Sequence, residues 1–183
     1  MVVCVIEEKP KIFDLIKNIL EANNCGNSIF LCGNADFSPD IKKYIVENDV
    51  LIFKCVNSCG QLYYPSLIDL AVVGECRKSV DTAKLGNIKS LLLNIENSNG
   101  VKSAGQNTQI ITCGLKEKDT VIFSSINLDE GSVILDLQRS VKNIKNETLE
   151  PFEEQINIPE SVLNAKAEDL ILSFTALKLC DII

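Results

Sequence analysis

The sequence predicts an α/β fold, with a mostly parallel three-layer sheet and an antiparallel β extension in the C-terminal half. Over the first hundred residues, short apolar runs alternate with stretches of helical spacing, a pattern typical of parallel strands joined by helices. Farther along, three β-rich runs are separated by turns too short to hold helices. The chain is 46% hydrophobic but only 5% aromatic, which suits an aliphatic core, and its 183 residues fit one domain, residues 1–183.

The N-terminal half contains most of the predicted parallel strands. A continuous apolar run predicts the first strand, and five apolar residues at helical spacing predict an amphipathic helix directly after it. Ser38 is a predicted helix cap because Pro39 and Asp40 follow it, and that helix ends at Asp49. The expected strands are 2–6, 28–32, 50–56, 70–73 and 90–95. The amphipathic helix is expected at 10–20, and one further helix is expected at 79–85.

The C-terminal half is predicted to change to antiparallel pairing. The strands expected there are 109–113, 120–126 and 132–137, with a further short strand at 155–158. Residues 162–179 carry apolar side chains at helical spacing and predict a long helix with a buried face.

The charge balance argues against polyanionic partners. Eighteen basic and twenty-five acidic residues give a formal net charge of −7, which repels nucleic-acid phosphates and anionic lipids. No apolar stretch approaches the ~20 residues of a membrane span. Because a secretory signal is not visible, we expect a cytoplasmic protein with reduced thiols, no nucleic-acid partner and no membrane association. The partner is an unknown protein or small molecule, and the oligomeric state stays open, with a homo-oligomer included.

Phosphate and histidine chemistry lack their usual residues. Neither Gly-x-x-x-x-Gly-Lys-Ser/Thr nor Gly-x-Gly-x-x-Gly occurs among the nine glycines, and the chain contains no histidine. We therefore expect no catalytic residue, no bound metal and no cofactor.

Two cysteines offer the one alternative that would make the chain an enzyme. Cys55 and Cys59 lie where the predicted third strand ends, at the edge of a parallel sheet where α/β proteins bind ligands. A thiol-dependent reaction would need a thiolate of lowered pKa, and Lys54 is the one flanking cation.

An acidic stretch near the C-terminus has two interpretations. It can bind a cation, or it can be a solvated edge that keeps exposed strands from pairing with other chains. The second interpretation is favoured. The stretch contains Glu147, Glu150, Glu153, Glu154 and Glu160.

The first twenty residues resemble a response-regulator receiver domain. Glu7 and Glu8 end the first strand and precede a proline and an amphipathic helix, as the acidic pair of a receiver does. The resemblance implies a degenerate signalling domain, because Lys54 stands near the end of the third strand, where a receiver carries its phosphoacceptor aspartate. This alternative predicts a five-stranded, all-parallel sheet.

A longer region, from Asp69 onward, resembles the second half of the central domain of Mur ligases, the ATP-dependent amide-bond-forming enzymes of peptidoglycan synthesis. Four segments carry the resemblance in the family's order: DLAVV at 69–73, LLNIEN at 92–97, IITCGL at 110–115, and IP at 158–159 followed by NA at 164–165. The resemblance implies antiparallel strands after Gly105.

The same region departs from the family where the chemistry would occur. The family's Asp-His turn is replaced by Gly74, Glu75, Cys76 and Arg77, and its paired aspartates by Glu96 and Asn97. The phosphate loop that precedes this region in the family has no counterpart in residues 1–66.

The sequence therefore predicts a non-catalytic Mur-ligase-like domain that acts as a binding or scaffold module, with a link to cell-wall metabolism. A ligand would lie beyond the carboxyl ends of the strands. The residues nominated there are Asn57, Ser58, Glu75, Asn94, Glu96 and Gly114.

Overall fold

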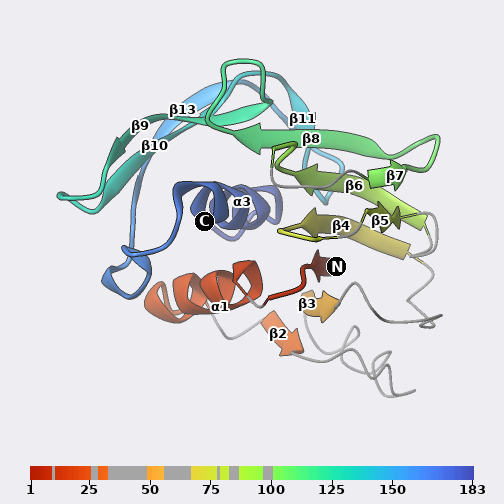
Figure 1. The fold of residues 1–183 in the computed structure, drawn as a ribbon, viewed down its shortest axis with the longest axis horizontal. Helices are drawn as coiled ribbons and strands as arrows, with labels where there is room; N and C mark the ends of the chain where they lie inside the picture. Colours follow the sequence, from red (N-terminus) through yellow and green to blue (C-terminus); the bar gives the residue numbers. More distant parts are fainter. Residues whose placement is uncertain are drawn as a thin grey trace.

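The computed structural model describes residues 1–9, 11–25, 29–32, 49–55, 67–77, 79–82, 87–96 and 101–183. These residues form one large sheet with two longer helices against it (Figure 1). The elements are β1 Val2–Ile6, α1 Ile12–Ala22, β2 Ile29–Cys32, β3 Val50–Cys55, β4 Leu67–Val73, β5 Val80–Asp81, β6 Asn87–Leu93, β7 Val101–Ser103, β8 Gln109–Gly114, β9 Val121–Asn127, β10 Ser132–Leu137, β11 Val141–Lys142, β12 Thr148–Leu149, β13 Phe152–Asn157, the 3-10 turn η3 Glu160–Val162 and α3 Ala167–Leu179.

The described strands of the large sheet lie in the order β13-β10-β9-β8-β6-β4-β1-β3-β2. From β2 to β8 all neighbours are parallel, so the α/β class and the mostly parallel sheet are confirmed. Ile6 pairs with Val73, and Val73 pairs with Leu93, so the carboxyl ends of β1, β4 and β6 form one row. The continuous apolar runs form these strands because a parallel sheet buries both faces of its strands.

The antiparallel extension is also confirmed, but it begins later than predicted. Strand β10 pairs antiparallel with both β9 and β13. The antiparallel prediction for 109–113 is wrong, since β8 pairs in parallel with β6 and, over its last two residues, with β9. The chain between Leu93 and Gln109 is long enough for the crossover that a parallel neighbour requires.

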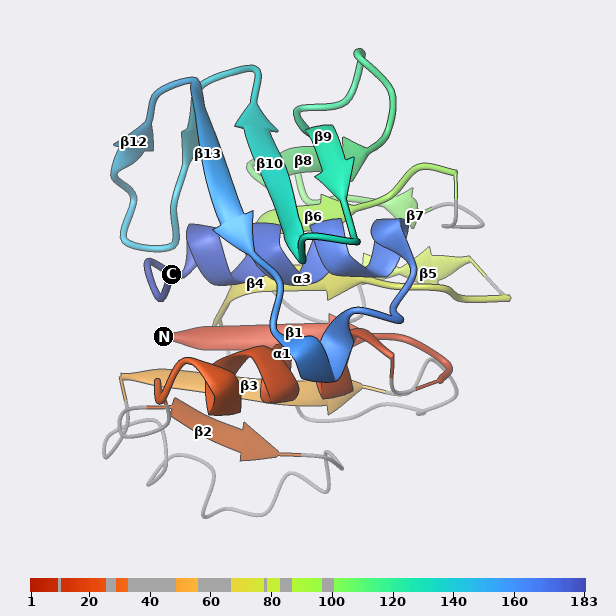
Figure 2. The same ribbon diagram turned by 90° about the vertical axis from the view of Figure 1, so that its left-hand side faces the viewer.

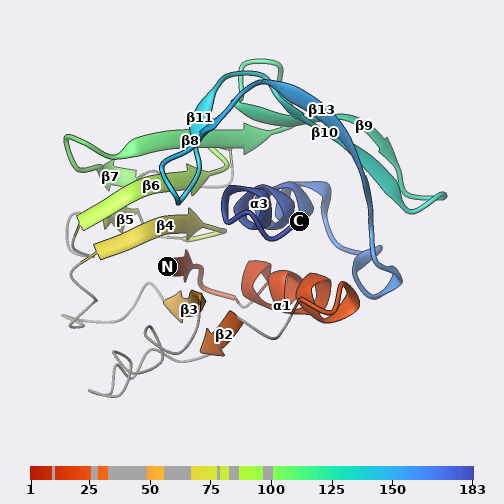
Figure 3. The same ribbon diagram turned by 180° about the vertical axis from the view of Figure 1, so that it is seen from behind.

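Helices α1 and α3 cover the same face of the sheet (Figure 2). The buried face of α1 consists of the five predicted residues, Ile12, Phe13, Ile16, Ile19 and Leu20. Helix α3 begins at Ala167 rather than at 162, because residues 160–162 form η3. The strands β9, β10 and β13 curve over α3, so this helix is enclosed between the sheet and its extension (Figures 1 and 3). No helix in the described ranges is long and apolar enough to cross a membrane.

The opposite face of the sheet has a second apolar cluster. The short parallel pair β5–β7 contributes to it through Val80 and Val101. The predicted helix 79–85 is therefore wrong at residues 80–81, where a β-branched valine pairs in a strand. The helix expected between Ser38 and Asp49 lies largely outside the described residues.

Candidate functional site

The carboxyl ends of β1, β4, β6 and β8 form the candidate site. The strand register places Glu7, Gly74 and Asn94, each directly after its strand, side by side at this edge. Gly114 ends the next strand, β8. Open α/β sheets bind ligands at this edge, so the chemistry of these groups decides what the domain can do.

Glu7 is the most deeply buried charged group at this edge. Its side chain turns back from the end of β1 onto the first turn of α1, and the residue is 1% exposed. Oε2 accepts hydrogen bonds from the backbone N–H groups of Lys11 at 3.1 Å and Ile12 at 2.9 Å, and Oε1 accepts one from Phe13 at 3.1 Å. The amides of Ile12 and Phe13 would otherwise lack an acceptor, whereas that of Lys11 also donates to the carbonyl oxygen of Lys9 at 2.8 Å, so Glu7 stabilises the start of α1.

Two opposing effects act on the Glu7 carboxyl. Burial raises its pKa, whereas the amides of Ile12, Phe13 and Lys11 lower it, and the net direction is upward. Gly74 leaves room for the Ile12 side chain at the start of α1. A Cβ at Gly74 would lie 2.7 Å from Ile12 Cδ1 and 3.2 Å from Glu7 Cβ, closer than packed carbons lie.

Glu75 is tied to the loop before α1 rather than turned toward a ligand. Its Oε2 accepts a hydrogen bond from Lys11 Nζ at 2.6 Å, and this ion pair raises the pKa of Lys11 and lowers that of Glu75. The neighbouring loop is held in the same way, because the backbone N–H of Arg77 donates to Glu8 Oε1 at 2.8 Å. Both contacts join the loop after β1 to the loop after β4.

Asn94, Glu96 and Gly114 are brought together, as predicted for residues at neighbouring strand ends. Asn94 is 3% exposed, and its Oδ1 accepts a hydrogen bond from the backbone N–H of Glu96 at 2.9 Å. Glu96 forms an ion pair with Lys116. A Cβ at Gly114 would lie 2.5 Å from Asp119 Oδ2, so a side chain at this position would displace this buried carboxylate.

Sequence reasoning missed Asp169 as a member of this edge. It lies in the first turn of α3 and is 8% exposed, and burial raises its pKa while Lys11 and Lys166 lower it. Lys11 thus lies in the field of Asp169 as well as in contact with Glu75. The sequence does contain a clue to Asp169, because an acidic residue stands there within an otherwise apolar helical stretch.

Two of the described cysteines near this edge have thiols whose pKa is raised by burial. Cys55 is 3% exposed, and its neighbour Cys4 has a pKa raised well above its usual value by burial and by Cys55. Burial raises the pKa of Cys76 to about 11. Cys59, Asn57 and Ser58 lie outside the described residues.

The acidic stretch is distributed over the extension. Glu153 and Glu154 lie on β13, which ends the described sheet, and Glu154 pairs with Lys178 at 2.5 Å. Glu150 accepts a hydrogen bond from Ser140, and Glu147 accepts one from Asn143. Within the ranges that the structure describes, acidic, cysteine and histidine side chains nowhere gather in the arrangement needed to hold a metal ion.

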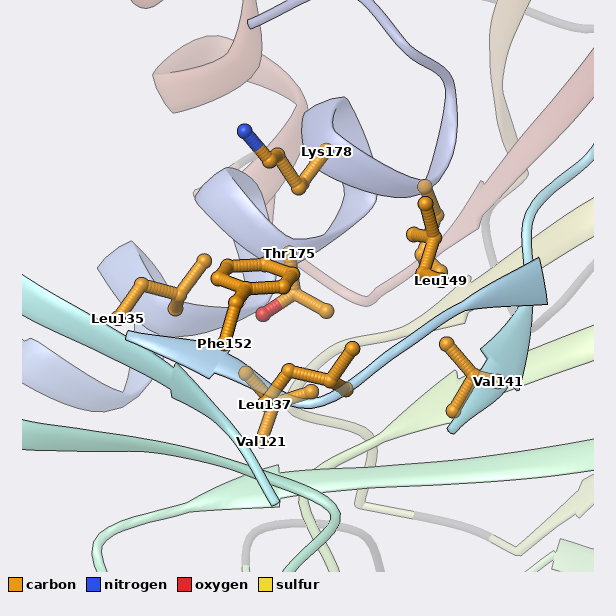
Figure 4. Close-up of a pocket in the computed structure, with 9 residues that line it drawn as sticks. Val121, Leu135, Leu137, Val141, Leu149, Phe152, Thr175 and Lys178 are labelled. Carbon is orange, nitrogen blue, oxygen red and sulfur yellow. The ribbon is translucent and has the colours of Figure 1, made fainter. Parts of the chain in front are cut away.

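A small apolar cavity lies away from the strand ends, between α3 and the extension (Figure 4). The space open to the centre of a water molecule is only about 10 Å³. Thr175 faces this region from α3, and its hydroxyl has no hydrogen-bond partner among the described residues. The cavity is lined by Val121, Leu135, Leu137, Val141, Leu149, Phe152, Thr175, Lys178 and Leu179.

Known protein-family models do not match this chain, and a search of curated proteins found no relative above the significance threshold. The fold and the contacts at the strand ends are therefore the basis for inferring a function.

Proposed function

We propose that this chain is a non-catalytic, Mur-ligase-like domain that acts as a binding or scaffold module linked to cell-wall metabolism. The observation that carries the proposal is the bonding at the carboxyl edge of the sheet. Glu7 accepts hydrogen bonds from the first amides of α1, and Glu75 forms an ion pair with Lys11. Asn94 accepts a hydrogen bond from the backbone two residues farther along the chain. Groups already paired within the chain hold loops together, and a reaction centre needs groups that are available to a substrate.

The sheet itself supports the family resemblance. The resemblance implied antiparallel strands after Gly105, and β9, β10 and β13 provide such pairing. A receiver-like domain would instead have an all-parallel sheet of five strands, which the described sheet contradicts. The acidic pair that suggested a receiver is also used differently, because Glu7 bonds to α1 and Glu8 to the backbone of Arg77.

The thiol-enzyme alternative has little support from the described cysteines. A nucleophilic cysteine needs an exposed sulfur and a lowered pKa. Cys55 is buried, and the thiols of Cys4 and Cys76 beside it have raised pKa values.

The proposal includes three finer points. Residues 1–183 form one domain in the cytoplasm, a third layer covers the second face of the sheet, and the partner is a protein or a small molecule. Burial of the apolar side chains on that second face supports the additional layer, since such a face needs cover.

Calorimetric titration of the protein with ATP and Mg²⁺ tests the proposal. We expect no saturable heat up to millimolar nucleotide and no phosphate release. The same titration with Glu75→Ala and Glu96→Ala shows how much of any heat comes from Mg²⁺ binding at these two exposed carboxylates. Micromolar binding by the unaltered chain, accompanied by turnover, would overturn the proposal.

A further inference from the structure

We propose that the free edge of β13 is a docking site for an extended basic segment of another protein, which adds to the sheet as one further strand. The inference goes beyond the proposed function, because it concerns the end of the antiparallel extension and not the carboxyl ends of the parallel strands. Strand β13 is the last described strand of the large sheet on this side. An edge strand has backbone groups that a strand of another chain can pair with.

The first observation is the direction of the backbone groups of β13. Its ladder with β10 continues one residue past the strand, where the Ile158 N–H donates to the Gly131 oxygen at 2.7 Å. Backbone groups in an antiparallel strand point to alternate sides, so those of Glu153, Gln155 and Asn157 point away from β10. Within the described ranges these groups have no other partner. They form a row of donors and acceptors along the edge.

The second observation is a groove beside the same edge. Its walls include residues 154–157 of β13 and, from α3, Phe174 and Lys178. The space open to the centre of a water molecule is about 220 Å³, compared with about 10 Å³ in the apolar cavity beside Thr175. Ile156 packs against the core and gives the groove an apolar wall. An added strand would therefore place alternate side chains in this groove.

The third observation is the uncompensated negative charge of the edge. Residues 147–160 contain five glutamates and no lysine or arginine. Lys178 in the groove is paired with Glu154 at 2.5 Å. Glu153 is exposed and stands directly opposite Asp136 of β10, and neither carboxylate forms an ion pair within the described ranges. Like charges in this position destabilise a ladder, so a lysine or arginine in a strand beside Glu153 would supply the missing counter-charge.

The same charges disfavour a second copy of this chain as the partner. Two β13 strands side by side would bring Glu153 and Glu154 of both copies into one short ladder, where like charges repel. Pro151 and Pro159 lack a backbone N–H and stand on either side of β13, so they limit the length of edge that can pair. The edge is thus protected against indiscriminate pairing and suited to a short basic strand.

Binding of a defined peptide tests the proposal. The probe is a hexapeptide of alternating valine and lysine, acetylated and amidated at its ends, and amide hydrogen exchange of the unaltered chain is followed by NMR. At saturating probe, exchange at Glu153, Gln155 and Asn157 should slow by about tenfold or more, because their N–H groups gain acceptors. A second peptide, in which proline replaces two valines, keeps the charge but cannot form the ladder, so it should protect none of them.

Two variants test the role of charge, with the Kd of the fluorescently labelled probe measured by anisotropy. Glu153→Lys replaces attraction by repulsion, so it should raise the Kd by about 3–30-fold. Glu117→Lys makes the same change of charge at an exposed residue between β8 and β9, and it should leave the Kd within about twofold. An equal rise in both variants overturns the proposal, because the attraction would then come from the net charge of the chain.

The unaltered chain supplies the remaining outcomes. Absence of saturable binding, equal binding of the proline peptide, or protection at other residues overturns the proposal. Protection of the same three amides without probe, together with a dimer in sedimentation, would identify a second copy as the partner and would also overturn it. None of these measurements involves a nucleotide, so failure here leaves the proposed function standing, and a positive ATP titration leaves this docking site standing.

Discussion

Replacing Thr175 by valine should stabilise the protein, although the substitution removes a polar group from the middle of a helix. Thr175 is 2% exposed, and its Oγ1 has no hydrogen-bond partner among the described residues. Burying a hydroxyl without a partner costs about 1–3 kcal/mol in proteins. Valine has nearly the same shape and nearly the same helix propensity, so the substitution leaves the α3 backbone and its neighbours in place.

The expected gain follows from the surroundings of that hydroxyl. The side chains near it, Leu135, Leu137 and Phe152 among them, are apolar, so a methyl group finds carbon contacts where the hydroxyl finds no acceptor (Figure 4). The cavity beside Thr175 is too small and too apolar to hold a well-bonded water. We expect a gain of about 1–2 kcal/mol, which corresponds to a rise in Tm of about 2–8 °C.

Differential scanning calorimetry of Thr175→Val, paired with Thr120→Val, measures this effect. Thr120 is also buried, but its hydroxyl lies 3.4 Å from that of Thr112 and shares a hydrogen bond with it. Thr120→Val should therefore lower the free energy of unfolding by about 0.5–1.5 kcal/mol. A lower Tm for Thr175→Val would refute the reasoning, because it would mean that the Thr175 hydroxyl has a partner in solution.

Three further predictions concern the strand ends. Gly74→Ala should lower the free energy of unfolding by about 1–3 kcal/mol in urea titrations, because its Cβ would overlap Ile12, and a neutral effect would contradict the packing at this strand end. Iodoacetamide should react with Cys76 far more slowly in the native protein than in urea, since its pKa is raised to about 11 by burial, and equal rates would contradict this. Because the folded pKa of Asp169 is raised above 3.8, the folded state binds this proton more tightly, and ionisation of Asp169 makes stability fall as pH rises. Urea titrations from pH 7 down to pH 4 should show the unaltered chain gaining stability relative to Asp169→Asn, and the opposite trend would contradict the burial of Asp169.

Strand β1 and helix α1 were predictable because the positions that each buries are apolar in the sequence. The run at β1 is apolar at every position since both faces of a central parallel strand are covered, and α1 carries its buried residues at helical spacing. The direction of β8 was not predictable in this way. Apolar runs mark a strand without indicating its direction, and only the length of the connection from β6 favours a parallel pair.

Part of the candidate site followed from topology alone. Asn94, Glu96 and Gly114 lie together because β6 and β8 are neighbours and both end at the same edge. The role of Glu7 did not follow, since the sequence shows its place after β1 but not the direction of its side chain. A clue lies at the start of α1. The residue at this helix boundary is Lys11, whose side chain cannot accept a hydrogen bond, so the first amides of α1 need an acceptor from another residue.

The amide signals of Ile12 and Phe13 in a ¹⁵N-resolved NMR titration with ATP and Mg²⁺ test the central claim most directly. Both amides donate to Glu7, so they should keep their chemical shifts as nucleotide is added to the unaltered chain. Saturable shifts of these two signals at micromolar nucleotide would show that a phosphate displaces the carboxylate, and would contradict the account.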